Sequence, residues 1–323
     1  MKSSFMLYGC LIGLLAACSK APDRDLFYFT GACDASAAVA LDRDLFVVAS
    51  DEDNILRVYS RFRPGPPVSQ VDLSAFLRPE KENEESDLEG AAQLGDRIYW
   101  ISSHGRNSKG KEQESRHRFF STTATVTNGA AQLRAVGNFY SGLLDDMIVD
   151  PRLAAFNLHS AAELPPKSPG ALNIEGLTAT PEGHLLIGFR NPIPKGRALL
   201  LPLLNPAELI EGYPAKFGTP VTLDLGGLGI RSMSYWHESY LIIAGPADGE
   251  GEPQLFRWSP GHEPKLVPAP QLRGLNPEAI AYSPGATDFL LISDDGTATV
   301  GGHDCKKLKA PAQRRFRALA FSL

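Results

Sequence analysis

The stretch NIEGLTAT (173–180), followed by the apolar run LLIGFRNP (185–192), decides the fold because near copies of it recur along the chain. The corresponding first halves of the other copies are DASAAVAL (34–41), DLEGAAQL (87–94), GIRSMSYW (229–236) and NPEAIAYS (276–283). From the third residue of each first half to the turn that ends the second half, the distance is 15 residues in four copies and 16 in the fifth. A spacing that is kept while the sequence diverges indicates one supersecondary unit used repeatedly.

The apolar second halves, such as YLIIAGPADG (240–249), show little polar alternation, which is typical of strands buried on both faces. Each first half ends in a turn and is predicted to form the preceding strand of a hairpin. Further strands follow each pair, as in ILRVYSRF (55–62), and the fifth unit continues with TATVGG (297–302) and RRFRALAFSL (314–323). Four-stranded units every 45–60 residues or so predict an all-β fold, a β-propeller of five blades.

Both ends of the chain bear on how such a ring closes. The segment DLFYFT (25–30) precedes the first unit, so strands from the two termini can complete one blade. The second unit is longer than the others because of a polar loop (104–118) and an insertion of helical character near 150–170. A sixth blade within that excess stays open, although no sixth copy of the phrase occurs. Two separate β-sandwiches are the alternative fold, but they do not explain why the spacing of the repeated phrase is kept across the middle of the chain.

The N-terminal region has the pattern of a lipoprotein leader. Residues 1–17 combine one positive charge with a short apolar run, and Leu15-Ala16-Ala17-Cys18 resembles a bacterial lipobox. We expect acylation of Cys18, for instance by palmitate, a short tether (18–25) and a propeller domain (26–323) in the cell envelope. Ser19 favours the outer membrane, with the domain facing the periplasm. An ordinary secretory signal with a chance cysteine is the alternative.

Two cysteines, Cys33 and Cys305, remain once Cys10 and Cys18 are assigned to the leader and the lipid. In an oxidising compartment we expect them to form a disulfide that joins the two ends of the propeller. Two unrelated buried thiols are the alternative. The net charge of −5 and the lack of a basic block argue against nucleic acid as a partner.

The repeated spacing places polar residues of every unit at one end of its hairpin. If the first strands are innermost, Glu89, Glu175, Glu278 and Arg231 converge at one mouth of the channel. Carboxylates suit hard cations, so we expect Ca²⁺ or Mg²⁺ as the metal if one binds. The candidate metal ligands are Glu89, Glu175, Glu278 and Asp294. The alternative is a purely structural role, in which these residues only bind the backbone of the neighbouring blade.

Arginine holds carboxylate or phosphate groups through two hydrogen bonds, so the basic residues near this mouth predict an anionic ligand. The candidate ligand-binding residues are Arg106, Lys109, Arg118, Arg190, Asn191 and Arg231. The candidate catalytic residues are Glu89 and Glu175, which would activate water, and His104, which would act as acid or base. A solvated insertion loop is the alternative for 104–118. The spacing of His104 and His117 matches no known zinc motif, so the sequence predicts no zinc site.

The phrases GACDASAAV, DLEGAA, RIYWISSHGRNSKGKEQESRHRFF, NIEGL with LLIGFRNP, and LLISDDG resemble a bacterial family known as domain of unknown function 3616. The resemblance covers most of residues 28–321. That family is more distantly similar to esterase-like phytases, which share the Glu-Gly-Leu/Ile phrase before an apolar strand. This likeness implies a propeller and a metal-dependent phosphoester hydrolase as one activity. Arg231-Ser232 in place of Glu-Gly departs from the pattern.

Together these features predict a lipid-anchored propeller that binds a small anionic or metal-bridged ligand, or a cell-envelope component, at one mouth. Hydrolysis of phosphate esters is the alternative function.

Overall fold

The computed structural model describes residues 26–81 and 84–323 of the chain. The predicted leader, the lipidation residue Cys18 and the tether up to residue 25 lie outside the described residues. No helix in the described part is both long enough and apolar enough to cross a membrane.

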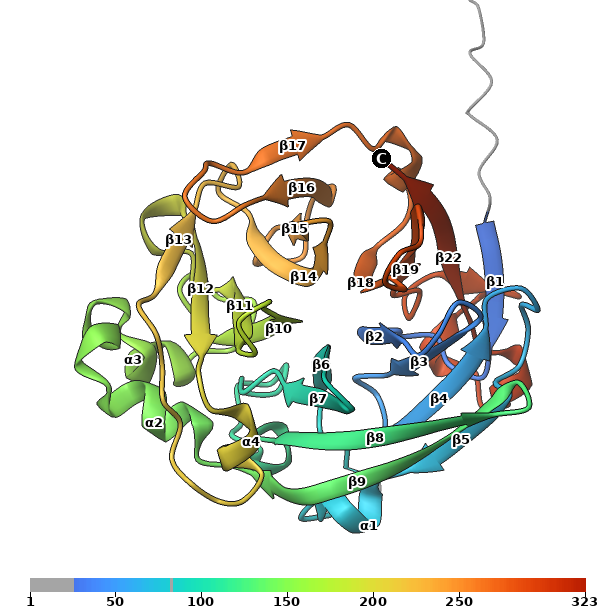
Figure 1. Cartoon of the computed structure of the whole chain (residues 1–323), viewed down its shortest axis with the longest axis horizontal. Helices are drawn as coiled ribbons and strands as arrows, with labels where there is room; N and C mark the ends of the chain where they lie inside the picture. The colour runs from blue at the N-terminus through green and yellow to red at the C-terminus, as the bar shows by residue number, and fades with distance from the viewer. Residues whose placement is uncertain (1–25, 82–83) are drawn as a thin grey trace, which may run out of the picture.

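Five four-stranded sheets stand around a central channel as the blades of a propeller, which confirms the predicted fold (Figure 1). The strands within every blade are antiparallel. Among the described residues there is no sixth blade. The strands of the first two blades are β2 (Ala37–Ala40), β3 (Leu45–Ala49), β4 (Ile55–Ser60) and β5 (Ser69–Asp72), then β6 (Leu88–Leu94), β7 (Arg97–Ser102), β8 (Phe119–Thr127) and β9 (Ala130–Tyr140).

The third and fourth blades follow the same order from the channel outward. Their strands are β10 (Asn173–Ala179), β11 (Leu185–Asn191), β12 (Ala198–Leu203) and β13 (Val221–Leu223), then β14 (Gly229–Trp236), β15 (Ser239–Gly245), β16 (Gln254–Trp258) and β17 (Lys265–Val267). The first strand of each blade is innermost, and each innermost strand contacts the next one around the ring.

The fifth blade is built from both ends of the chain. Its order is β18 (Pro277–Ala281), β19 (Asp288–Ser293), β22 (Arg315–Ser322) and β1 (Leu26–Thr30). Leu26 pairs with Leu319 and Thr30 with Arg315, so the N-terminal strand closes the ring. The prediction that TATVGG belongs to this blade was wrong. Its strand β20 (Thr299–Val300) pairs only with β21 (His303–Asp304), because the two glycines that follow turn the chain straight back.

Each of the five hydrophobic clusters lies between two neighbouring blades. The cluster at the closure contains Phe29, Phe46, Tyr59 and Phe316, whose ring centroids lie 5.1 to 5.7 Å from their neighbours. Burying one large apolar side chain is worth about 1.5–3 kcal/mol, so this cluster contributes substantially to holding the first and fifth blades together.

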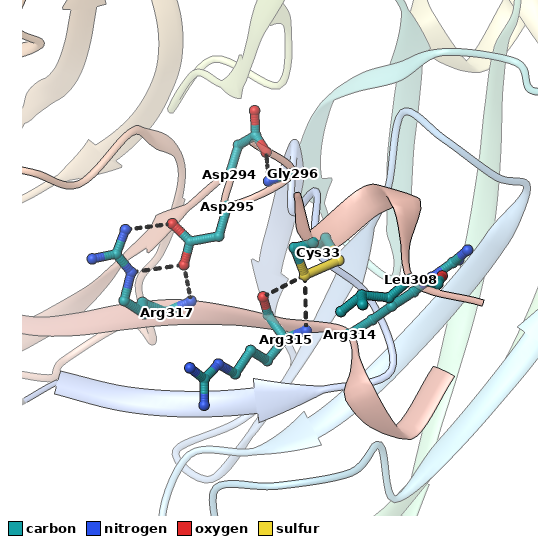
Figure 2. The surroundings of a disulfide bond; sticks show 9 residues. Cys33, Asp294, Asp295, Gly296, Leu308, Arg314, Arg315 and Arg317 are labelled. Carbon is teal, nitrogen blue, oxygen red and sulfur yellow. Dashed lines mark hydrogen bonds and ion pairs between the residues drawn. A yellow bond between two sulfur atoms is a disulfide. The ribbon is translucent and has the colours of Figure 1, made fainter. Parts of the chain in front are cut away.

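The predicted disulfide between Cys33 and Cys305 is present and lies against β22, where the two ends of the chain meet (Figure 2). Their Cα atoms are 5.8 Å apart although the residues are separated by 272 positions. Beside the bridge, Asp295 accepts hydrogen bonds from the Arg317 guanidinium at 2.6 and 2.8 Å.

The predicted helical insertion packs on the outside of the second and third blades (Figure 1). It begins earlier than predicted, because α2 (Leu143–Val149) precedes the 3-10 helix Pro151–Phe156 and α3 (Leu158–Ala162). Two single-turn helices, α1 (Ser74–Leu77) and α4 (Pro206–Leu209), lie on the rim. Further 3-10 helices are Glu114–Arg116, Pro194–Gly196, Pro270–Leu272, Cys305–Lys307 and Pro311–Gln313.

The two mouths of the channel differ in chemistry. At the mouth where the innermost strands end, a cavity of about 650 Å³ is lined mainly by apolar side chains such as Met233, Tyr235 and Ile280. The opposite mouth, where these strands begin, carries the charged residues of the repeated phrase and is called the polar mouth below.

Candidate functional site

Four of the five innermost strands carry a β-bulge at the polar mouth. The ladder between the first and second strand of these blades skips one residue, which is Glu89, Glu175, Arg231 or Glu278. A bulged residue is freed from the pairing pattern, and bulges often re-aim a side chain beside a functional site. The predicted charged residues of the phrase are therefore the bulged ones.

Close packing against the next blade explains why glycine follows Glu89 and Glu175. A Cβ atom on Gly90 would lie 2.8 Å from Ile101 and 3.0 Å from the Leu177 Cβ of the next blade. On Gly176 it would lie 2.8 Å from Ile230, again in the next blade. In these two blades the phrase therefore places a bulged carboxylate next to a point where neighbouring blades approach closely.

One part of the polar mouth, the compensated half, consists of Glu175, Arg190, Arg231 and Glu278. Arg190 Nη1 lies 2.6 Å from Glu175 Oε1, and Arg231 Nε lies 3.4 Å from Glu175 Oε2. Arg231 also pairs with Glu278 and donates a hydrogen bond to Asn276. All four charged side chains are buried, so each carboxylate here has a guanidinium partner out of water.

The other part, the acidic half, consists of Asp34, Asp51, Asp87 and Glu89. One carboxylate oxygen from each of Asp51, Asp87 and Glu89 lies within 4.8 Å of the others. Asp34 and Glu52 form a second such group with Asp51. The Oδ1 atom of Asp51 is buried and has no hydrogen-bond partner among the described residues.

Burial and mutual repulsion raise the pKa values of the carboxyl groups in the acidic half. Burial, followed by the charge of Asp294, raises the pKa of Asp34 to about 9. Burial also raises the pKa of Asp51 and of Glu89 well above the usual range, and neighbouring carboxylates add to the effect. Three like charges this close repel one another unless protons or a cation neutralise them.

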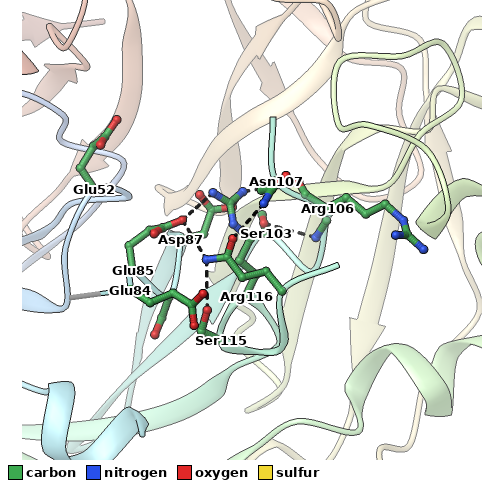
Figure 3. Close-up of polar contacts among 12 residues, drawn as sticks. Glu52, Glu84, Glu85, Asp87, Ser103, Arg106, Asn107, Ser115 and Arg116 are labelled. Atoms are coloured by element: carbon green, nitrogen blue, oxygen red, sulfur yellow. Dashed lines mark hydrogen bonds and ion pairs between the residues drawn. The ribbon is translucent and has the colours of Figure 1, made fainter. Parts of the chain in front are cut away.

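Asp87 has one basic partner. Arg116 lies between two carboxylates, with Nη1 2.8 Å from Asp87 Oδ2 and Nη2 2.6 Å from Glu85 Oε1 (Figure 3). Burial raises the pKa of Asp87 to about 6, against the lowering effect of Arg116.

Lys306 lies at the edge of the acidic half. Its Nζ lies 3.1 Å from Glu52 Oε1 at the edge of a small cavity of about 70 Å³, which Asp34 and Glu52 also line. Both side chains of this ion pair are more than a third exposed, so water screens it.

The predicted residues of the polar loop do not join the polar mouth. His104, Arg106 and Arg118 line a separate cavity of about 710 Å³, the lateral cavity, between the loop and the helical insertion. Arg106 donates to the carbonyls of Ala162 and Gly110, and Arg118 donates to those of Leu77, Glu114 and His117. Their guanidinium groups therefore brace the loop against its surroundings.

The other predicted residues are distributed as follows. Asn191 is buried and its amide donates to the carbonyls of Pro166 and Ser168, where it holds the insertion in place. Lys109 is exposed on the loop. Asp294 accepts hydrogen bonds from the Asn276 amide at 3.2 Å and from the Gly296 backbone at 2.8 Å.

Sequence reasoning did not select Asp34, Asp51 and Asp87, although signals for them were present. Asp51 ends the second half of the first unit, and its backbone N–H donates to Ser36 Oγ at 3.3 Å, 15 residues away. Asp34 and Asp87 open the phrases DASAAVAL and DLEGAAQL. Only the packing of the first blade against the second brings Asp51 to Asp87 and Glu89, and Asp34 lies on the far side of Asp51 with Glu52.

The family profile for the protein of unknown function DUF3616 matches residues 34–129 and 112–272, which together cover most of the propeller. The chain belongs to the DUF3616 family. The two matched segments contain the acidic half of the mouth, the polar loop and the compensated pair Glu175 and Arg190. No curated protein matches the chain.

Solved structures similar to this DUF3616 protein include the glutaminyl cyclase of Myxococcus xanthus, with 13% identity over 92% of this chain and 95% of the other, and a TM-score of 0.47. The PQQ-bound aldose sugar dehydrogenase of Streptomyces coelicolor has 13% identity over 93% of this chain and 100% of the other, with a TM-score of 0.41. At these values the likenesses carry no argument about what this chain binds.

Proposed function

We propose that the polar mouth binds a divalent cation, with Ca²⁺ as the best fit, through Asp51, Asp87 and Glu89. The observation that carries this proposal is that the three carboxylate oxygens lie within 4.8 Å of one another. Two oxygens that contact one Ca²⁺ at about 2.3–2.6 Å are at most about 5 Å apart, and each pair of the three meets this condition.

Ca²⁺ suits this arrangement better than Mg²⁺ does. The carboxylates come from two separate segments, one that carries Asp51 and one that carries Asp87 and Glu89. Ca²⁺ accepts irregular coordination by oxygen, whereas Mg²⁺ demands a tight octahedron. The buried Oδ1 of Asp51, which has no partner among the described residues, supports a ligand role because an isolated buried acceptor is costly. A cation would also relieve the repulsion that raises the pKa values of this half.

Three protein ligands leave further coordination positions on Ca²⁺, which takes about six to eight oxygens. We propose that a small anionic ligand fills these positions, so that the cation bridges the ligand to the propeller.

Calorimetric titration of the protein with Ca²⁺ after removal of metals by EDTA tests the cation site. We expect one Ca²⁺ per chain, and binding at least about tenfold weaker in the variant Asp51→Asn/Glu89→Gln, because two of three charged ligands are lost. The exposed Asp224→Asn variant is the matched control and should bind as the wild type does. Equal binding by the double variant and the wild type would exclude this site.

Phosphoester hydrolysis is a second candidate function for the same mouth. Two buried guanidinium groups, those of Arg190 and Arg231, lie in the same channel as the proposed cation, and such groups stabilise charge that develops on a phosphoryl group. Assays with aryl phosphates and phytate in Ca²⁺ or Mg²⁺ decide this point. Turnover that survives in the Asp51→Asn/Glu89→Gln variant would show that it does not use this site.

We also propose that lipid on Cys18 anchors the protein in the cell envelope. Mass spectrometry of the protein from its membrane fraction should find acyl chains on Cys18, and Cys18→Ala should move the protein to the soluble fraction. A wild-type protein without acyl chains would contradict the anchor.

A further inference from the structure

The lateral cavity contains a histidine whose ring has one unsatisfied nitrogen. His104 is only 1% exposed, and its Nδ1 lies 2.8 Å from the carbonyl oxygen of Ser102. A carbonyl can only accept, so Nδ1 carries the proton and Nε2 keeps a free lone pair. This Nε2 atom is buried and has no hydrogen-bond partner among the described residues.

The backbone also holds His104 in an unusual conformation. Its φ is +55°, in the left-handed region that side chains other than glycine seldom adopt. Its N–H donates to the carbonyl of Arg116 at 3.0 Å, which ties the start of the loop to its end. The surrounding structure thus fixes both the position of the ring and its tautomer.

A second imidazole lies next to this ring. The ring centroids of His104 and His117 are 5.4 Å apart, and the planes are inclined at 63°. Two histidines that bind one tetrahedral Zn²⁺ at about 2.0–2.1 Å have their ring centroids about 5 Å apart. The observed separation therefore suits one shared metal ion.

The donor pattern is that of a metal-binding histidine. Such a residue donates its other ring N–H to a backbone carbonyl or a carboxylate, which fixes the tautomer and orients the lone pair toward the metal. The bond from Nδ1 to Ser102 meets this condition.

The charged side chains that line the lateral cavity are also compatible with a bound cation. Carboxylates of Glu112, Glu114, Asp145 and Glu163 line it, against three arginines. Two of these arginines, Arg106 and Arg118, donate hydrogen bonds to backbone carbonyls. The Cζ atom of Arg118 also lies 4.4 Å from the Phe139 ring centroid.

We propose that His104 and His117 bind a late first-row transition-metal ion, such as Zn²⁺, with water in the remaining positions. Neutral imidazole nitrogen suits Zn²⁺, Cu²⁺ and Ni²⁺, whereas the carboxylates of the polar mouth suit Ca²⁺. This site is independent of the proposed function, because it shares no residue with the polar mouth.

Titration of the tag-free protein with Zn²⁺, followed by calorimetry, tests the proposal. We expect one Zn²⁺ that excess Ca²⁺ does not displace, and at least about tenfold weaker binding in His117→Ala, which loses one of the two nitrogen ligands. His104→Asn should weaken binding equally. Asparagine tolerates a positive φ, so this variant keeps the loop folded.

Two controls separate a specific site from general zinc binding by histidine. His262→Ala removes an exposed histidine in the fourth blade and should leave the affinity unchanged. With Co²⁺ as the probe, the visible spectrum of nitrogen-bound cobalt should appear in the wild type and vanish in His104→Asn. Unchanged Zn²⁺ affinity in the His104→Asn/His117→Ala double variant would overturn the proposal, whatever the outcome of the Ca²⁺ titration.

Discussion

The two halves of the polar mouth use the same repeated position but differ in how they neutralise charge. In the compensated half, Arg231 stands between Glu175 and Glu278, and Arg190 takes the remaining oxygen of Glu175. In the acidic half, Asp51, Asp87 and Glu89 crowd together, and the Arg116 guanidinium reaches one of the three.

The difference shows that an irregular repeat can build asymmetry into a symmetric ring. The first unit has Ser36 where others have a charged residue, and its innermost strand pairs without a bulge. The carboxylate of Asp51, in the turn that follows β3, occupies this sector instead. Buried like charges cost free energy unless a counter-charge is bound, so a cation would relieve repulsion in the acidic half, whereas arginines already supply the counter-charge in the compensated half.

The largest effect is expected when the compensated half is made to resemble the acidic one. Arg231→Met keeps most of the side-chain volume but leaves Glu175 and Glu278 with less counter-charge out of water. We expect a loss of about 3–5 kcal/mol in the free energy of unfolding at neutral pH, measured by denaturant titration. Arg134→Met, on the exposed face of β9, is the control. A loss no larger than that of the control would mean that the arginine does not stabilise this half.

Removing the disulfide should loosen the acidic half in particular. Cys33 is the neighbour of Asp34, and Cys305 is the neighbour of Lys306. We expect Cys33→Ser/Cys305→Ser to lower the free energy of unfolding by about 2–4 kcal/mol, because the bridge closes a very long loop. Ca²⁺ binding should weaken in parallel. Undiminished Ca²⁺ affinity would show that the acidic half does not depend on the closure.

The pH dependence of stability should reveal the raised pKa of Asp34. A carboxyl group with a folded pKa of about 9 and an ordinary unfolded value binds a proton in the folded state only, so stability falls as pH rises between these values. We expect the melting temperature of the metal-free protein to fall as the pH rises from about 7 to about 8.5, which is above the range in which histidine titrates. Asp34→Asn should flatten this slope, and so should Ca²⁺. A slope unaffected by Asp34→Asn would contradict the assignment.

The smallest effect is expected from the exposed end of the acidic half. Lys306→Met removes a positive charge beside Glu52 and should strengthen Ca²⁺ binding by only about twofold, since water and salt screen this charge. Its effect should shrink as salt is added. Lys216→Met, which removes an exposed ion pair with Glu208 on another part of the surface, should change nothing.

Much of the fold was predictable because the repeated phrase encodes it directly. The apolar second halves became the buried strands β3, β7, β11, β15 and β19, and the phrase itself became the innermost strand of each blade. The closure by RRFRALAFSL and the N-terminal strand followed from their positions at the chain ends. TATVGG was misplaced because two β-favouring residues before a glycine pair fit a short hairpin as well as a blade strand.

The site was less predictable because it depends on partners from different blades. Glu175 and Glu278 were expected to share a metal with Glu89, but their distances to Arg190 and Arg231 place them in ion pairs. His104 and Arg106 were expected near the mouth. In the structure they line the lateral cavity, between the polar loop and the helical insertion. No spacing along the chain indicates how far His104 lies from His117.

The sequence alone therefore indicated a propeller built from repeats of one unit, the rim that carries the charged residues, and the pair of cysteines that meet at its closure. These features depend on local patterns and on a fixed repeat length, which a linear sequence displays. The tertiary structure alone decided which charges neutralise each other, which carboxylates crowd together, and which histidine keeps a free nitrogen. Such properties depend on distances of a few ångström between residues far apart in the chain, and only the packing of one blade against the next sets those distances.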